Sequence, residues 1–171
     1  KYDFEMIARS KIAYIDSWFG KPALQAISYA NRFGKPIVLQ SGPWTPRNIL
    51  SGVWVTVHSI SDYENADPGD LIQEDLNDGV TLSVITLGAS GCIFGTGRKI
   101  ISTPGNQVNV VDATGAGATF TSGIIHGLLM ELELEQLPAL ANRIAGYKVS
   151  KLGNLSKTDI PLITQIAKQW V

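Results

Sequence analysis

The residues best suited to chemistry lie together in the segment Asp112–Phe120, which reads DATGAGATF. Gly115 and Gly117 allow backbone amides to turn inward, where they form a nest for an anion. The helical pattern that follows adds unpaired N–H groups and the positive end of a helix dipole. The segment therefore predicts a phosphate-binding loop, although a tight turn that only packs a helix against a sheet explains the glycines about equally well. Ala118 carries a methyl group where such chemistry usually needs a carboxylate, so we ask whether the loop transfers a phosphoryl group or only holds one.

Composition narrows the class of protein in which this loop sits. The 171 residues are 44% hydrophobic and 17% charged, which is typical of one globular domain with a sizeable core. The net charge of −1 gives no electrostatic reason to expect nucleic acid or an anionic membrane as a partner. Apolar stretches such as 123–130 are too short to span a bilayer, and we expect no signal peptide. Cys92 is the one cysteine, which suits the cytoplasm or a reducing organelle interior.

Short apolar runs alternate with amphipathic ones, and this alternation predicts a single α/β domain over residues 1–171. The predicted strands are Ile12–Asp16, Pro36–Gln40, Val53–His58, Leu82–Thr86, Cys92–Gly95 and Val108–Val111. The predicted helices cover residues 21–33, Leu71–Leu76, Gly117–Glu131, Leu137–Lys151 and Ile160–Gln169, with Asp159 as the N-cap of the last one.

The first two strands indicate how the sheet is built. Between them, Leu24, Ile27 and Ala30 recur at helical spacing, and Gly34 then supplies a left-handed cap before the next strand. The result is a βαβ unit, so we expect a mostly parallel, doubly wound sheet with right-handed crossovers. The carboxyl ends of its strands are where a ligand site is expected.

The sequence resembles the C-terminal part of the PfkB family of carbohydrate and nucleoside kinases, which have the ribokinase-like fold. The family motif near the end reads roughly D-x-T-G-A-G-D-x-F, and this chain has DATGAGATF. The segment Ser83–Cys92 is similar to the family's apolar strand, T-x-G and Gly-rich turn, and Leu140–Asn154 is similar to its nucleotide-flanking helix. The stretches AYIDSWFG and KPIVLQSG resemble two earlier core strands, so the resemblance covers nearly the whole chain in the right order.

The resemblance implies a nucleotide site for ATP with Mg²⁺ and assigns a role to individual residues. Gly115, Ala116 and Gly117 would supply the anion hole for the transferred phosphate. Asp62 would be linked to magnesium. The nucleotide-binding positions implied are Thr86, Gly88, Gly91 and Asn142, with Asn142 near the adenine, and the implied monovalent-cation or structural positions are Asp112 and Thr114.

The departures from the family pattern favour a site that has decayed. The last Asp of the motif, which takes the proton from the substrate hydroxyl in the family, is Ala118 here. The family's N-x-x-E is reduced to the residues 59–62, SISD, and its Asp-Pro-Asn turn reads QSGP at 40–43. The family's sugar-binding residues and β lid lie in an N-terminal part that we expect to be missing. We therefore expect no intact catalytic residue.

Three functions remain open at this point. The chain is either a degenerate kinase domain that binds nucleotide or acts as an interaction module, a kinase fragment or subunit completed by another chain, or a structural remnant with an empty loop. In each case the missing N-terminal part predicts exposed apolar surface, so we expect a homo-oligomer or another protein chain over the edge near Ile12–Asp16.

Overall fold

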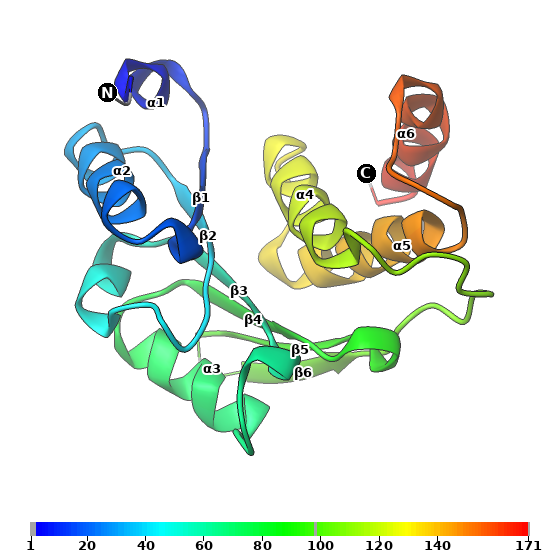
Figure 1. The fold of residues 1–171 in the computed structure, drawn as a ribbon, viewed down its shortest axis with the longest axis horizontal. Helices are drawn as coiled ribbons and strands as arrows, with labels where there is room; N and C mark the ends of the chain where they lie inside the picture. Colours follow the sequence, from blue (N-terminus) through cyan, green and yellow to red (C-terminus); the bar gives the residue numbers. More distant parts are fainter. Residues whose placement is uncertain (1–2, 98, 171) are drawn as a thin grey trace. The chain divides into compact units, whose positions relative to one another are not determined.

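The computed structural model describes residues 3–97 and 99–170 and contains a six-stranded sheet (Figure 1). The strands follow one another across the sheet in chain order, and the first four pair in parallel. Their bounds are Ala13–Asp16 (β1), Ile37–Gln40 (β2), Val55–Ser59 (β3), Leu82–Thr86 (β4), Cys92–Thr96 (β5) and Lys99–Thr103 (β6).

The α-helices of the described residues are Glu5–Arg9 (α1), Lys21–Arg32 (α2), Pro68–Asn77 (α3), Ala116–Leu129 (α4), Leu137–Val149 (α5) and Ile160–Lys168 (α6). Short 3₁₀ turns, labelled η1 to η6, lie at Ser17–Phe19, Arg47–Gly52, Ile60–Asp62, Gly88–Ser90, Leu134–Gln136 and Lys157–Asp159. The chain divides into two compact units, and its description as a single domain stays a prediction. The first unit runs to Thr86 and includes Ile93–Ile101, and the second contains Leu87–Cys92 and the chain from Ser102 onward.

In the first unit, α2 and α3 cover the same face of the sheet. The strand registers place Ile15, Leu39, Thr56 and Ser83 in one row across β1 to β4. At the β1–β2 end of this row, Ile15 and Leu39 pack in one core cluster with Ile27 of α2. At its other end, the hydroxyls of Thr56 and Ser83 bind a carboxylate of α3. Consecutive crossovers that advance in one direction across a parallel sheet place their helices on one face, which explains this arrangement.

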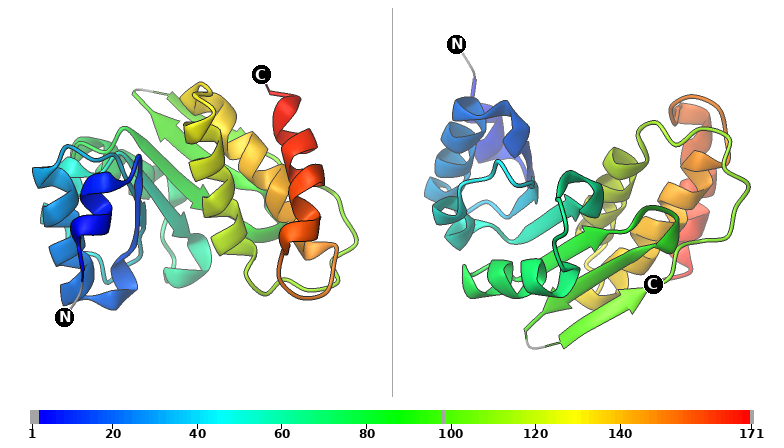
Figure 2. Two further views of the ribbon diagram at one scale, coloured as in Figure 1. Left: turned by 90° about the horizontal axis from the view of Figure 1, so that it is seen from above. Right: turned by 60° about the horizontal axis from the view of Figure 1, so that its bottom comes forward.

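The second unit is built on helix packing (Figure 2). Helix α4 packs along α5. Helix α6 also packs on α5, where Ala167 of α6 forms a buried cluster with Leu140 and Ile144 of α5. Gly123 of α4 lies so close to α5 that an added Cβ would be 2.7 Å from Cα of Ala141. The two helix axes therefore approach closely because a glycine stands at their crossing.

Four of the predicted strands are observed within one or two residues at each end, and Leu82–Thr86 has the predicted bounds. The predicted strand Val108–Val111 is wrong. That segment pairs with no strand among the described residues, and Val111 N instead donates to Val149 O at the end of α5. Strand Lys99–Thr103 was not predicted, because it is exposed along most of its length and lacks the apolar alternation of a half-buried strand.

Asp159 lies directly before α6, as predicted, but its carboxylate does not cap that helix. Its Oδ2 atom accepts a hydrogen bond from the backbone N of Ser156 at 2.7 Å, within a capping box of the preceding 3₁₀ turn. Its Oδ1 atom accepts from Tyr147 Oη at 2.7 Å and pairs with Lys151. Asp159 thus ties α5 to the start of α6 rather than closing the first turn of α6.

Candidate functional site

The predicted phosphate loop forms a turn at the start of α4, in the second unit. Gly115 has φ of 77°, in the left-handed region that its position before the helix requires. The amide of Ala116 is used within the turn, where it donates to Ala113 O at 3.1 Å. Within residues 99–170, the amides of Gly115, Gly117 and Ala118 donate no hydrogen bond to the protein. The available donors therefore include Gly115, Gly117 and Ala118, and the anion hole of Gly115, Ala116 and Gly117 stays a prediction.

The surroundings of these amides are open. Gly117 and Ala118 are exposed, and a Cβ added at Gly117 would meet nothing within 4 Å. Ala118 presents only its methyl group beyond the backbone. The positive end of the fourteen-residue helix α4 therefore faces accessible space that lacks a side chain for proton transfer at position 118.

Asp112 anchors the beginning of the loop. Its Oδ1 atom accepts from Thr114 N at 2.9 Å, and its Oδ2 atom accepts from Gly153 N at 3.0 Å. Hydrogen bonds from the backbone and side chain of Thr114, followed by that from Gly153, lower the pKa of the Asp112 carboxyl to about 2. The nearby ammonium group of Lys148 acts in the same direction. Asp112 and Thr114 are therefore hydrogen-bonded to each other, and their role at a monovalent cation stays a prediction, whereas no sequence pattern indicated Lys148.

Three other residues predicted to bind nucleotide lie at the end of β4 and at the 3₁₀ turn that follows it. Thr86 ends β4 in the first unit and donates its hydroxyl to His58 O at 3.1 Å. Gly88 and Gly91 flank a 3₁₀ turn in the second unit, with φ of 60° and 94°. A Cβ at Gly91 would overlap the backbone of Thr103 and Pro104, so glycine is required there for packing as well as for its conformation.

Asn142 is buried within the second unit. Its Nδ2 atom lies 3.3 Å from Pro104 O, 3.4 Å from Thr103 O and 3.5 Å from Cys92 Sγ. These contacts tie α5 to the chain that leaves β6. The observed role of Asn142 is therefore structural, and its contact with an adenine stays a prediction. Burial raises the pKa of the Cys92 thiol to about 12, as expected for a small buried hydrophobic residue.

Asp62, the predicted magnesium-linked residue, ends a 3₁₀ turn after β3 and is exposed. Ser59, which the resemblance matches to the family's Asn, shares a 2.7 Å hydrogen bond with Ser61. Among the described residues, no group of three or more His, Cys, Asp or Glu side chains is arranged to hold a metal ion. A magnesium ion here would thus need phosphate oxygens and water for most of its ligands, which is how Mg²⁺ is commonly bound.

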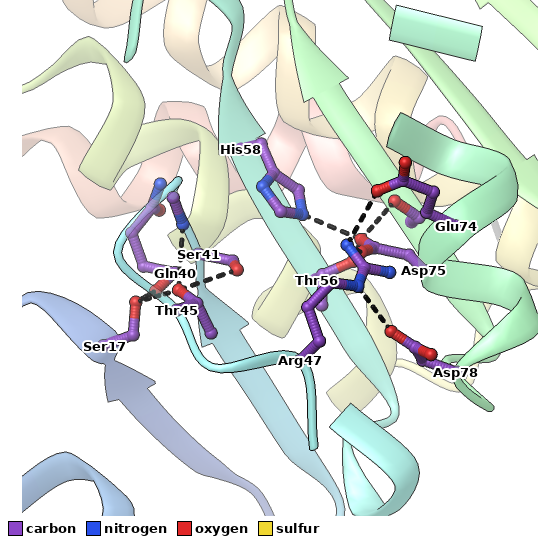
Figure 3. A network of polar contacts seen from close by, with 12 residues as sticks. Ser17, Gln40, Ser41, Thr45, Arg47, Thr56, His58, Glu74, Asp75 and Asp78 are labelled. Carbon is purple, nitrogen blue, oxygen red and sulfur yellow. Dashed lines mark hydrogen bonds and ion pairs between the residues drawn. The ribbon is translucent and has the colours of Figure 1, made fainter. Parts of the chain in front are cut away.

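A buried polar network in the first unit was not predicted as a group (Figure 3). Asp75 of α3 is 1% exposed, and its Oδ2 atom accepts from Thr56 at 2.6 Å and Ser83 at 2.8 Å. The same oxygen lies 2.8 Å from His58 Nε2, and His58 Nδ1 lies 2.7 Å from Tyr63 Oη. His58 is therefore part of a structural network.

Arg47 partly offsets the negative charge at this network within the first unit. Arg47 lies 3.4 Å from Asp75 Oδ1, 3.2 Å from Glu74 and 2.6 Å from Asp78 (Figure 3). The adjoining pocket of about 190 Å³ is lined by Ser41, Thr45, Arg47, His58, Tyr63 and Asp75, among others. Since Arg47 already faces three carboxylates, we assign this pocket a structural role and no phosphate.

With the geometry established, similarity to known proteins identifies the family. The model of the pfkB family carbohydrate kinases matches residues 53–160. The chain belongs to the PfkB family. It is also 34% identical to mouse ribokinase over 116 residues, which are 63% of this chain and 35% of ribokinase. The chain spans about a third of the length of the curated relatives that it matches.

Solved structures show that this PfkB chain has the ribokinase fold. Ribokinase of Thermotoga maritima superimposes with a TM-score of 0.80 at 17% identity, over 96% of this chain and 60% of that one. A putative ribokinase II of E. coli, solved with ATP and Mg²⁺, gives a TM-score of 0.77 at 17% identity, over 98% and 61%. The predicted fold class is thus confirmed. Among residues 3–97 and 99–170, no helix is both long and apolar enough to cross a membrane.

Proposed function

We propose that this PfkB-family domain binds the phosphate groups of a nucleotide at the start of α4 and transfers phosphate poorly or not at all. The observation that carries the proposal is the set of available amides at Gly115, Gly117 and Ala118, exposed at a helix N-terminus. Such amides stabilise negative charge without the help of a particular side chain. A solved relative contains ATP and Mg²⁺, which makes ATP–Mg the first ligand to test.

Weak transfer follows from the side chains at the positions to which the resemblance assigns catalysis and magnesium. Ala118 cannot accept the proton of an attacking hydroxyl, and loss of a general base costs about 10²–10⁴ in rate. Ser59 and Asp62 stand where the resemblance predicts the amide and the longer carboxylate that organise magnesium and its waters. Phosphoryl transfer depends mainly on positioning and electrostatics, so these changes reduce it further.

Calorimetry with ATP–Mg tests the binding proposal. Gly117→Asp adds a carboxylate where the structure has free space, so it repels an anion with little disturbance of packing. We expect the unmodified chain to bind and Gly117→Asp to bind at least about tenfold more weakly, equal to about 1.4 kcal/mol. Gly117→Ala adds the same Cβ without charge and separates obstruction from repulsion. Absence of heat and of any melting shift in excess ATP–Mg would contradict the proposal and favour a structural remnant.

Ala118→Asp tests the second half of the proposal. If loss of the base alone silenced the site, restoring the carboxylate should return about 10²–10⁴-fold in rate. We expect almost no recovery, because the magnesium positions at 59 and 62 are also altered. The measurement is phosphate transfer from ATP to a panel of sugars and nucleosides by both chains. Robust turnover by the variant would show that one substitution silenced the enzyme, and robust turnover by the unmodified chain would refute the proposal.

A second candidate is a kinase subunit whose remaining part is supplied by another chain. The observation that favours it is that this chain spans about 60% of the length of its solved relatives. In that case a partner would supply the acceptor site and the proton-accepting carboxylate. Co-purification of the native protein followed by the same transfer assay distinguishes the two. Activity that appears only with a partner would favour the subunit.

A further inference from the structure

A buried ammonium group stands against the first residue of the phosphate loop. Lys148, in the last turn of α5, is 1% exposed. Its Nζ atom donates to the backbone oxygen of Asp112 at 2.8 Å and lies 3.5 Å from Asp112 Oδ2. Lysine is almost never fully buried unless it is paired. The pairing places a fixed positive charge beside the residue that the family resemblance links to a monovalent cation.

The oxygen atoms of Asp112 are occupied by donors of the chain itself. Thr114 N and Gly153 N each take one carboxylate oxygen, and Lys148 takes the backbone oxygen and approaches the carboxylate. Each oxygen atom keeps a lone pair that could coordinate an ion, but a potassium ion there would lie beside the ammonium charge of Lys148, which is 2.8 Å from the backbone oxygen and 3.5 Å from Oδ2. The residues present therefore fit a separate potassium-like ion poorly, and fit an ammonium group well.

We propose that the side chain of Lys148 is a built-in substitute for a monovalent cation at Asp112. An ammonium group resembles potassium in size and charge, and both interact with carbonyl and carboxylate oxygen atoms. Because the group is tethered to α5, no ion has to be recruited from solution. The inference goes beyond the proposed function, since it concerns how the loop is held whether or not the loop binds an anion.

The backbone around this pair shows what the ammonium group would hold in place. Val149 O, next to Lys148, accepts from Val111 N at 2.8 Å and from Asp112 N at 3.1 Å. The chain entering the loop is therefore joined to the C-terminal end of α5 through backbone and side chain together. A cation in the last turn of a helix is also favoured by the negative end of the helix dipole. Removing the charge should loosen this junction and lower the stability of the second unit.

Thermal unfolding in different salts tests the proposal. The unmodified chain should have the same Tm in KCl and in choline chloride at equal ionic strength. Lys148→Ala removes the charge and leaves room, so its Tm should fall by roughly 5–10 °C in choline chloride. Its Tm should then rise by about 3 °C or more in KCl, because an ion can enter the space. Lys148→Met fills the same space without charge and should show the fall without the rise.

Lys157→Ala is the matched control, because this lysine of the second unit is exposed. It should change neither the Tm by more than about 1 °C nor its response to potassium. A specific rise of the Tm of the unmodified chain in KCl would overturn the proposal, and this measurement holds even if the Lys148 variants do not fold. A Lys148→Ala variant that folds but does not respond to potassium would also overturn it, since Lys148 would then act only through packing.

Discussion

At the scale of single residues, Lys148 and Asp75 are buried charged groups that are each enclosed by several partners. Lys148 is held by the backbone and carboxylate of Asp112, and Asp75 accepts hydrogen bonds from Thr56, Ser83 and the ring of His58. Buried charges persist where such partners offset the loss of hydration. Neither group could be identified from sequence, because a lysine or aspartate on an amphipathic helix is usually a solvated residue.

Asp75→Asn should lower the free energy of unfolding by about 2–4 kcal/mol at neutral pH, because three donors lose a charged acceptor in a buried site. Urea denaturation followed by circular dichroism measures the change. Asp70→Asn is the control, since Asp70 is an exposed residue of the same helix and should cost less than about 1 kcal/mol. Equal losses in the two variants would show that the network contributes nothing specific.

The pH dependence of this stabilisation has a defined sign. Burial raises the pKa of Asp75, but the hydrogen bonds and charge of His58 and the hydroxyls of Thr56 and Ser83 outweigh it, so the pKa is lowered. A carboxyl whose folded pKa is depressed contributes stability that is present above its unfolded pKa of about 4 and is lost as pH falls through the folded value. The difference between the unmodified chain and Asp75→Asn should therefore shrink below about pH 4. A constant difference from pH 7 to pH 3 would contradict this.

At the scale of elements, the sequence predicted those segments whose pattern reflects burial. Leu82–Thr86 is buried at every position but its last, so its bounds were predicted correctly. Lys99–Thr103 was missed because its pairing with a neighbour, not its burial, makes it a strand. Val108–Val111 has the composition of a strand, yet Val110 is 56% exposed. The segment is hydrogen-bonded to the C-terminal end of α5 through Val111 N and Val149 O. Hydrogen bonds between separate segments of the chain determine whether each of these two segments is a strand. A local sequence pattern does not indicate such bonds.

The loop at Asp112–Ala118 was predicted from its glycines, and its backbone has the expected form. The sequence could not show that the amide of Ala116 closes the turn, because glycine spacing allows several hydrogen-bond patterns. It also could not place Asn142, whose side chain is enclosed by residues from distant parts of the second unit. Roles that depend on contacts between distant segments therefore needed the structure.

The crossing of α4 and α5 gives a prediction at the same scale. Alanine normally stabilises a helix interior relative to glycine by up to about 1 kcal/mol. At Gly123 its Cβ would lie 2.7 Å from Cα of Ala141, so Gly123→Ala should instead destabilise by about 1–3 kcal/mol. Gly117→Ala is the matched comparison, because a Cβ there meets nothing within 4 Å and should not destabilise. Chemical denaturation of both variants measures the difference, and stabilisation by Gly123→Ala would mean that the helices can separate at no cost.

At the scale of the whole molecule, the resemblance to the PfkB family predicted the fold correctly, and the matched family model confirms it. A fold does not fix a function, since activity resides in particular side chains. Here the glycines that carry the resemblance precede α4, while Ala118 stands where the resemblance would place a proton acceptor. The expectation of a domain that holds phosphate and transfers it weakly therefore depends on a few residues rather than on the architecture.

The last prediction concerns assembly. Strand β1 lies at one edge of the sheet, and its outward residue Tyr14 is 47% exposed, with Trp18 and Phe19 just beyond it at 69% each. An exposed edge with apolar neighbours invites pairing with another chain, and a lysine on the edge prevents it. We therefore expect a homodimer in sedimentation at micromolar concentration and a monomer for Tyr14→Lys. Ile160→Lys, which places the same charge at an exposed apolar position of α6, should remain dimeric. A monomeric unmodified chain would show that the edge is solvated, and a dimer that persists in Tyr14→Lys would place the contact on another surface.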